Sequence, residues 1–156
     1  MRPSDLDAVL RVQAACYPPA MQEAADVVGA RLRAAAATCA VACDDDGVCG
    51  YLFSYPSRRG LVTSLDGPFE VAADADTLYL HDLAVEPRAL GRKLARRLVD
   101  QLVEVARAQG LRCSALVAVQ DSARFWEALG YRAAATGDPA LATYPAGAVY
   151  MLRAPL

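Results

Sequence analysis

The chain has 156 residues, of which 55% are hydrophobic and 22% are charged, and its formal net charge is −2. This length suits one domain, and the composition is too apolar for a disordered chain. Because cations are not in excess overall, the sequence argues against nucleic acid or an anionic membrane as a partner.

The first half of the chain predicts two helices and then a hairpin. Ser4 or Asp5 can cap a helix that ends at the pair Pro18-Pro19, and a second helix is expected over about residues 21–37. Two short apolar runs, 39–42 and 48–53, flank an Asp-Gly turn, which favours two antiparallel strands. Residues 57–76 contain many Gly, Pro, Asp and Ser residues, and they predict a loop that carries function.

The second half alternates strands with helices. We expect strands over 78–85, 111–119, 131–135 and 148–153, a helix over about 90–109, and a short helix around Phe125 and Trp126. Alternation along the 78–85 strand predicts that Tyr79, His81, Leu83 and Val85 share one face, with Leu80, Asp82 and Ala84 on the other. This order predicts an α/β (mixed α+β) domain over residues 1–156, with one mixed sheet and helices on its faces.

The cysteines and the first residues indicate the compartment. The cysteines are odd in number, and none forms a pair of CxxC units that could hold a metal: Cys16, Cys39, Cys43, Cys49 and Cys113. The chain starts without an apolar signal segment, and it has no apolar run long enough to span a bilayer. We therefore expect a cytoplasmic protein with reduced thiols and no metal.

A basic turn follows the 78–85 strand. Its cations crowd the start of the predicted 90–109 helix, where the helix dipole already disfavours positive charge: Arg88, Arg92, Lys93, Arg96 and Arg97. Free amides at a helix start, a glycine at Gly91 and a cluster of cations together suit a phosphate. The other interpretation is a solvated basic face of the helix.

Three segments carry a resemblance to a known family. They are the strand ending Leu83-Ala84-Val85-Glu86-Pro87, the hexapeptide Leu90-Gly91-Arg92-Lys93-Leu94-Ala95, and the helix ending Ala123 to Tyr131. In this order and spacing, residues 78–131 resemble the GNAT superfamily of acyl-CoA-dependent N-acetyltransferases. Leu90 stands where that family has Gln or Arg, and Lys93 stands where it has its first signature glycine.

The resemblance implies a fold, a co-substrate and a binding site. The implied GNAT-like fold has a mostly antiparallel sheet of about six to seven strands flanked by about four helices. Acetyl-CoA would be the co-substrate, without a metal, and a homodimer is compatible with the family. The implied coenzyme A contacts are Leu83, Ala84, Val85, Leu90, Gly91, Arg92, Lys93, Leu94, Ala95, Arg96, Ser122 and Phe125, although Ser122 also suits a helix cap and Phe125 a core position.

His81, the single histidine, is the leading candidate for a catalytic base. An alkylammonium must lose a proton before it attacks a thioester, and imidazole titrates in the right range to accept it. His81 also resembles one of the strand histidines of the arylalkylamine acetyltransferase branch. The alternatives are a hydrogen-bonded, half-buried histidine, or Glu86 or Asp82 as the base.

The catalytic acid is less evident, because Trp126 stands where the family has a tyrosine and an indole N–H does not titrate at neutral pH. Tyr144 and Tyr131 are the substitutes, and we take Tyr144 as the catalytic candidate. A coenzyme A thiolate can also leave without a dedicated acid. We expect direct attack in a ternary complex rather than an acyl-cysteine intermediate. Among the cysteines only Cys113 is a candidate for activation, and its place at the start of a buried strand suits packing better.

These features predict an N-acetyltransferase that moves an acetyl group from acetyl-CoA to a primary amine, with a small molecule as the acceptor. The acceptor pocket is expected to form from the 17–19 turn, the 53–55 strand end and the Tyr144 loop. Two alternatives stay open: a non-catalytic acyl-CoA-binding module, and an enzyme that acetylates a protein N-terminus or lysine.

Overall fold

The computed structural model describes residues 1–65 and 67–156. Within these residues the chain forms one six-stranded sheet in the order β1-β2-β3-β4-β6-β5, in which only β3 and β4 pair in parallel. The strands are β1 Ala40–Asp44, β2 Gly47–Ser57, β3 Thr77–Val85, β4 Cys113–Ala118, β5 Arg132–Ala133 and β6 Val149–Arg153. The predicted mixed, mostly antiparallel sheet is therefore confirmed.

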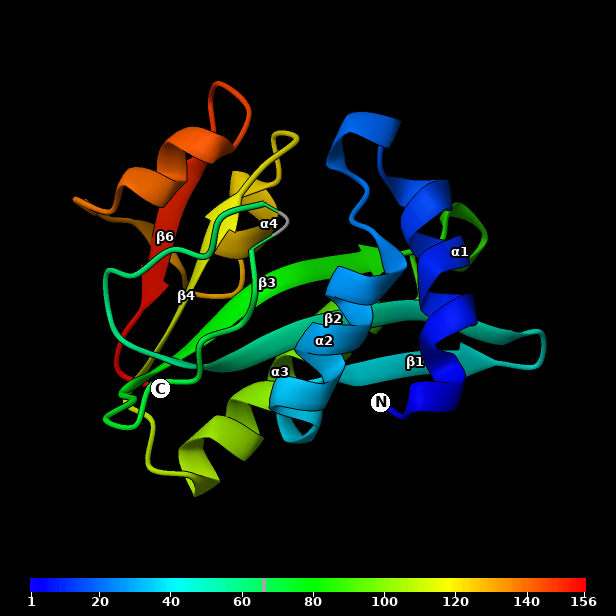
Figure 1. Cartoon of the computed structure of the whole chain (residues 1–156), viewed down its shortest axis with the longest axis horizontal. Helices are drawn as coiled ribbons and strands as arrows, with labels where there is room; N and C mark the ends of the chain where they lie inside the picture. Colours follow the sequence, from blue (N-terminus) through cyan, green and yellow to red (C-terminus); the bar gives the residue numbers. More distant parts are fainter. Residues whose placement is uncertain (66) are drawn as a thin grey trace.

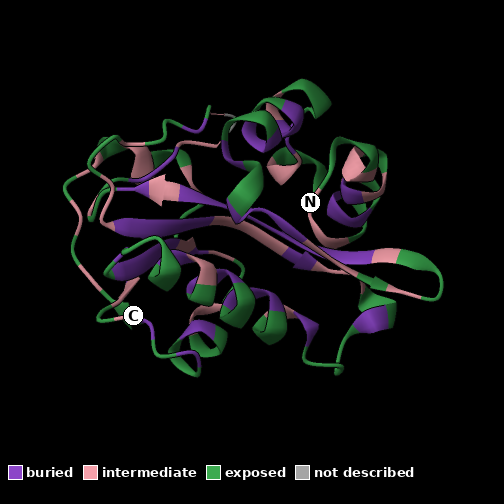
Figure 2. Ribbon diagram, turned by 90° about the horizontal axis from the view of Figure 1, so that it is seen from below, coloured by how far each residue is buried: buried purple, intermediate pink, exposed green. Residues whose placement is uncertain are grey.

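Helices cover both faces of this sheet (Figures 1 and 2). The α-helices α1 Leu6–Cys16 and α2 Ala25–Ala35 lie on one face, and α3 Leu94–Ala108 and α4 Ala123–Glu127 lie on the other. Short 3-10 helices connect them: η1 Pro3–Asp5, η2 Pro19–Met21, η3 Ala36–Thr38, η4 Pro87–Ala89 and η5 Pro139–Thr143. No helix in the described ranges has both the length and the apolar character needed to cross a membrane.

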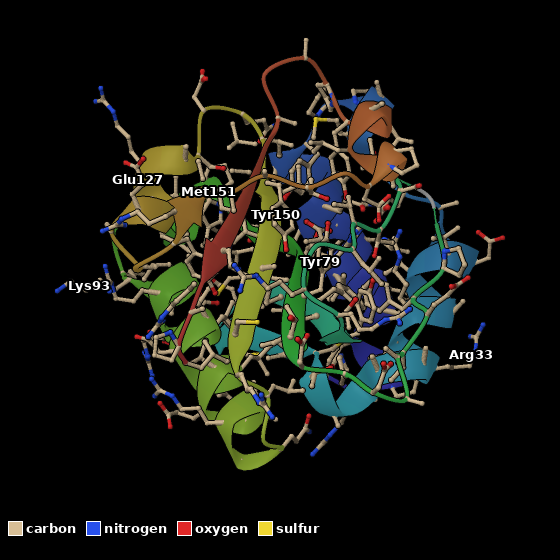
Figure 3. All side chains as sticks on the ribbon, turned by 90° about the vertical axis from the view of Figure 1, so that its left-hand side faces the viewer. Arg33, Tyr79, Lys93, Glu127, Tyr150 and Met151 are labelled. Atoms are coloured by element: carbon tan, nitrogen blue, oxygen red, sulfur yellow. The ribbon has the colours of Figure 1, made fainter. Side chains whose placement is uncertain are left out.

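The sheet separates two hydrophobic cores. Leu52 of β2 and Leu102 of α3 belong to the core under α3, whereas Tyr51 belongs to the core under α1 and α2. The same alternation is visible on β6, where Met151 points toward α3 and α4 and Tyr150 points toward the opposite face (Figure 3). Period-two side-chain alternation thus supplies both cores from the same strands.

Helix α3 begins four residues later than the sequence predicted. Gly91 and Lys93 have positive φ angles of 79° and 59°, so the segment before Leu94 forms a turn rather than a helix. The end of α3 agrees with the prediction, because Gly110 takes a φ of 78° directly after it. Apolar side chains at Leu94, Leu98 and Leu102 form the buried stripe of the helix.

Helix α2 also begins later, at Ala25 rather than near Met21. The side-chain amide of Gln13 bonds the backbone of Glu23 twice, donating to its carbonyl at 2.9 Å and accepting from its N–H at 3.1 Å. These bonds from α1 use the backbone groups of Glu23, which lies just before α2 begins at Ala25. The segment between α1 and α2 is therefore fixed to α1 by a buried side chain.

A β-bulge at His81 changes the predicted faces of β3. Phe53 of β2 pairs with Asp82 and Ser54 pairs with Leu80, so His81 is the extra residue. After the bulge the alternation restarts one residue out of phase. His81 and Asp82 therefore lie on the same side as Tyr51 and Glu23, and the predicted separation of His81 from Asp82 was wrong.

Leu102 tests the core that holds α3 on the sheet. The side chain is 2% exposed, and Leu102→Ala should lower the free energy of unfolding by about 2–5 kcal/mol, because a cavity remains in the core. Urea unfolding measures this loss. Gln101→Ala, on the exposed side of the same helix, is the matched control and should change stability by less than about 0.5 kcal/mol.

Candidate functional site

A cavity lies where the parallel strands β3 and β4 separate. Their pairing runs from Thr77 with Cys113 to Leu80 with Leu116 and then stops, although both strands continue (Figure 1). The opening is a cleft of about 520 Å³. Its walls come from β3, β4 and the starts of α3 and α4, so residues distant in sequence meet around one elongated space. An apolar cleft of this size is typical of a small-molecule or coenzyme site.

The start of α3 forms one end of the cleft. Gly91, Lys93 and Arg96 line it, and the first amides of α3 have no partner within the helix. A Cβ atom at Gly91 would meet nothing within 4 Å, so the positive φ of 79° is what requires glycine there. Lys93 holds a left-handed conformation at the N-cap, and its side chain points outward (Figure 3). This end combines helix-dipole and side-chain positive charge.

Two arginines of the basic turn are occupied by acids. Arg88 and Arg92 each donate to the same oxygen of Asp44 at 2.8 Å, and Arg88 also bonds Glu86 at 2.6 Å. Asp44 lies at the end of β1, so the hairpin supplies an acidic partner that is remote in sequence. The predicted cluster is thereby divided: Lys93 and Arg96 line the cleft, and Arg88 and Arg92 bond to acids beside it.

Most of the predicted coenzyme A contacts surround this cleft. Ala84 and Arg92 do not line it: Ala84 is buried in the core under α1 and α2, because the bulge reverses its side, and Arg92 pairs with Asp44. The predicted residues that do line it are Leu83, Val85, Leu90, Gly91, Lys93, Leu94, Ala95, Arg96, Ser122 and Phe125.

A second, smaller cavity of about 30 Å³ adjoins the other end of the cleft. Tyr17, His81 and Asp82 line both spaces, together with Val117 and Val119. Residues from the α1–α2 segment and from the Tyr144 loop complete the smaller cavity. The structure therefore brings the 17–19 turn and Tyr144 together as predicted, whereas Phe53 and Tyr55 are buried in the core.

His81 is buried and pairs with an acid that the sequence analysis did not identify. Its side chain is 2% exposed, and Nε2 lies 3.3 Å from Oε1 of Glu23. Glu23 also forms a buried ion pair with Arg31. Burial by itself would raise the pKa of Glu23, but His81 and Arg31 outweigh it and lower this pKa to about 2. Glu23 is thus ionised at neutral pH.

Asp82 places a second carboxyl at the junction of the two cavities. It accepts a hydrogen bond from the hydroxyl of Tyr51 at 2.6 Å. Burial raises the pKa of Asp82, and the hydrogen bond from Tyr51 acts in the opposite direction. A cation entering the cavity would favour the ionised form of this carboxyl.

None of the aromatic residues considered as a catalytic acid is well placed. Tyr144 lines the small cavity, but its hydroxyl donates to the carbonyl of Thr63 at 2.7 Å, and burial raises its pKa. Tyr131 lies in the core, bonded to Ser114 at 2.8 Å, and burial raises its pKa to about 12. Trp126 lines the cleft and packs edge-on against Phe125.

The low pKa of Glu23 has a consequence for acid stability. A carboxyl whose pKa is lowered on folding stabilises the protein above its ordinary pKa, and that contribution is lost as the pH falls through the folded value. The free energy of unfolding should therefore decrease between about pH 4.5 and 2. In Glu23→Gln this decrease should be smaller, measured by urea unfolding across the range. Glu70→Gln, which removes an exposed carboxyl, should retain the wild-type pH dependence.

Comparison with known proteins identifies the family. Residues 6–131 match the model of the Acetyltransferase (GNAT) family. No curated protein sequence matches the chain significantly. Solved structures share the fold: the GphF GNAT-like decarboxylase in complex with isobutyryl-CoA has a TM-score of 0.81 and 18% identity over 99% of this chain and 96% of that one.

Two further structures are similar over nearly the whole chain. The loading GNATL domain of CurA from Lyngbya majuscula has a TM-score of 0.80 and 12% identity, with 97% of this chain and 93% of that one covered. The NatC complex bound to Gag peptide and CoA has a TM-score of 0.73 and 16% identity, with 99% and 92% covered. These likenesses show the fold alone, whereas the family match spans most of the sequence, so the chain belongs to the GNAT acetyltransferase family.

Proposed function

We propose that this protein transfers an acetyl group from acetyl-CoA to the primary amine of a small molecule. The observation that carries the proposal is the polarity of the cleft. Lys93 and Arg96 lie with the free amides of α3 at one end, and His81 and Asp82 lie at the other. Such a cleft suits a molecule with phosphates at one end and a thioester at the other.

The end of the cleft beside the start of α3 fits the pyrophosphate of a coenzyme. Phosphate oxygens bind best to backbone amides at a helix start and to nearby cations. Leu83 and Val85 of β3 line the cleft beyond the end of the β3–β4 pairing, where an extended ligand such as a pantetheine arm can lie along the strand. The Leu83 carbonyl accepts a hydrogen bond from the Tyr17 hydroxyl at 3.0 Å, and the Val85 carbonyl accepts one from Cys16 Sγ at 3.4 Å. Two solved structures of this fold are complexes with isobutyryl-CoA and with CoA, which supports a coenzyme A ligand for this cleft.

The His81 end supplies the chemistry. In our proposal the amine nitrogen attacks the thioester carbonyl carbon, the C–S bond breaks, and the coenzyme A thiolate leaves. His81 accepts the proton that the amine loses, and the proton then passes to the thiolate or to water. With Tyr144 bonded to Thr63, we assign the thiolate no dedicated acid, which its modest basicity permits.

The acceptor side is covered by two loops that are bonded to each other. The 58–65 segment and the 134–148 segment are joined by hydrogen bonds that include Tyr144 to the carbonyl of Thr63 at 2.7 Å and Thr136 to the carbonyl of Gly60 at 2.7 Å. The cavity beneath them is only about 30 Å³. This cover favours a slim primary amine over a polypeptide, which would need an open groove.

The carboxyls of this region favour a cationic acceptor and disfavour an anionic one. Asp82 lines both cavities, and Glu23 lines the smaller one. An acyl group with a terminal carboxylate, as a decarboxylase requires, would approach these acids and be repelled. Electrostatics therefore support amine acetylation here over the decarboxylation named for one structural neighbour.

An assay of purified protein with acetyl-CoA and a panel of amines tests the proposal by thiol release and by the mass of the product. We expect turnover with small alkyl or arylalkyl amines and little with peptides. Thermal stabilisation by coenzyme A without turnover on any amine would instead support the non-catalytic module. Faster turnover with peptides would identify a protein acetyltransferase.

His81→Ala should lower kcat by about 100-fold or more, because general-base assistance is lost, while the affinity for acetyl-CoA stays within about twofold. Steady-state kinetics and calorimetric titration measure the two quantities. Tyr144→Phe is the matched control in the same small cavity, and it should retain at least about half of the wild-type kcat. Equal losses in the two variants would contradict the assignment of His81 as the base.

Lys93 and Arg92 are adjacent cations with different surroundings: Lys93 lines the cleft, and Arg92 pairs with Asp44. Lys93→Asn keeps a residue that tolerates the left-handed conformation and removes the charge, so acetyl-CoA should bind about tenfold more weakly, or about 1.4 kcal/mol. Arg92→Asn removes a charge that Asp44 already neutralises, and the affinity should fall less than about threefold. Calorimetric titration compares them, and a larger loss for Arg92→Asn would contradict this division.

A further inference from the structure

The carboxylate of Glu23 holds the His81 imidazole from one side. Oε1 of Glu23 lies 3.3 Å from Nε2, and the two side chains are 6% and 2% exposed. The contact joins the bulge in the middle of β3 to the segment that precedes α2, 58 residues away in sequence. Water is therefore largely excluded from this pair, which strengthens its electrostatic interaction.

Glu23 itself is fixed from several directions. Gln13 bonds both backbone groups of Glu23, and Arg31 forms a buried ion pair with its carboxylate. Arg31 is in turn held by the carbonyl of Gly67, at 3.0 Å from Nε and 2.7 Å from the second terminal nitrogen. The guanidinium also lies 5.0 Å from the centre of the Phe69 ring.

This arrangement is more than stability requires. A buried ion pair contributes little net stability compared with apolar side chains of similar volume, because both ions lose their hydration. Here the pair is linked to the one histidine of the cleft, whose ring is also edge-on to Phe69 at 5.4 Å. The contacts with Glu23 and Phe69 restrain the orientation of the imidazole, and a general base must be held in a fixed orientation toward its substrate.

The charge state of Glu23 determines which nitrogen of His81 carries the proton. With a pKa of about 2, Glu23 is ionised at neutral pH and can only accept hydrogen bonds. The neutral imidazole must then donate from Nε2, which leaves the lone pair on Nδ1. Nδ1 is buried and has no hydrogen-bond partner among residues 1–65 and 67–156. A buried acceptor without a partner is costly, and a transient partner such as a substrate N–H would explain it.

We propose that Glu23 is a positioning residue that fixes His81 as the Nε2–H tautomer and leaves Nδ1 to accept the proton of the acceptor amine. This inference rests on the proposed function for its catalytic part. When the amine attacks, its proton moves to Nδ1, the imidazole becomes a cation, and Glu23 stabilises that cation without taking the proton. Arg31 keeps Glu23 a weak base, so the proton stays on the imidazole and can return to the thiolate or to water.

The tautomer can be measured directly, without an assay of activity. His81 is the only histidine of the chain, so its two ring nitrogens give the only imidazole signals in a ¹⁵N NMR spectrum of the labelled protein. At a pH where the ring is neutral we expect a protonated Nε2 and an unprotonated Nδ1. A predominant Nδ1–H tautomer in the wild-type protein would overturn the inference.

Two variants test the catalytic part. Glu23→Gln keeps the shape but lets the side chain donate as well as accept, so the Nε2–H preference should be lost and kcat should fall about tenfold or more. The KM for acetyl-CoA should stay within about twofold, because Glu23 does not line the coenzyme cleft. Because this variant leaves Arg31 buried without its carboxylate, Glu23→Gln combined with Arg31→Gln removes both charges and serves where the single variant does not fold.

The outcomes separate this inference from the proposed function. An unchanged tautomer and an unchanged kcat in folded Glu23 variants would overturn the role of Glu23 while acetyl transfer stands. An Nε2–H tautomer that depends on Glu23, in a protein without turnover on any amine, would overturn the acetyltransferase proposal and still support the positioning of His81. Loss of both tautomer and kcat, with the KM for acetyl-CoA retained, supports both.

Discussion

The separation of β3 from β4 is the constraint on which the site depends. In a parallel pair each strand normally satisfies the backbone groups of the other along its length. Here the ladder stops at Leu80 and Leu116 while both strands continue, so a cleft opens inside the sheet where β3 and β4 no longer pair with each other. The two hydrophobic cores hold the strands in this position from both faces, and the space does not close by collapse.

The bulge at His81 lies one residue beyond Leu80, the last residue of β3 that pairs with β4. This placement gives the bulge a chemical consequence. Without the extra residue, His81 and Asp82 would alternate to opposite faces of the sheet. With it, both line the cavities on the α1–α2 side, close to Glu23 and Tyr51. A single inserted residue therefore gathers the titratable groups, while the β3 residues beyond it, Leu83 and Val85, still line the cleft.

The sequence predicted the fold well because its signals are local. The Asp-Gly turn, the apolar stripe of α3 and the stop at Gly110 each depend on a few neighbouring residues, and each appears in the structure. The same local logic failed at the bulge, because period-two alternation does not reveal an extra residue. It also missed the Asp44 partner of Arg88 and Arg92, which only the folded hairpin brings near the basic turn.

Glu23 is a site residue that local sequence patterns could not reveal. In the sequence it is one acidic residue between Gln22 and two alanines, with no spacing that relates it to His81. Its contact with His81 forms only in the folded chain, where Gln13 fixes the backbone before α2 and Arg31 compensates the charge of Glu23. Residues of this kind lie in connecting segments and act through a remote partner, so their signal is a three-dimensional charge pattern rather than a motif.

Two departures from the family pattern, Lys93 and Trp126, are consistent with the distribution of charge along the cleft. Lys93 occupies a left-handed position that glycine would hold without strain, and it adds a cation at the end of the cleft where α3 begins. Trp126 removes a titratable group from the cleft, yet the opposite end retains His81, which pairs with Glu23, and the carboxyl of Asp82. In the proposed reaction, positive charge at one end of the cleft and negative charge at the other set the direction in which the acyl-CoA and the ammonium bind. In the proposed reaction the attacking amine must lose a proton, and Glu23 holds the His81 imidazole that we propose accepts it.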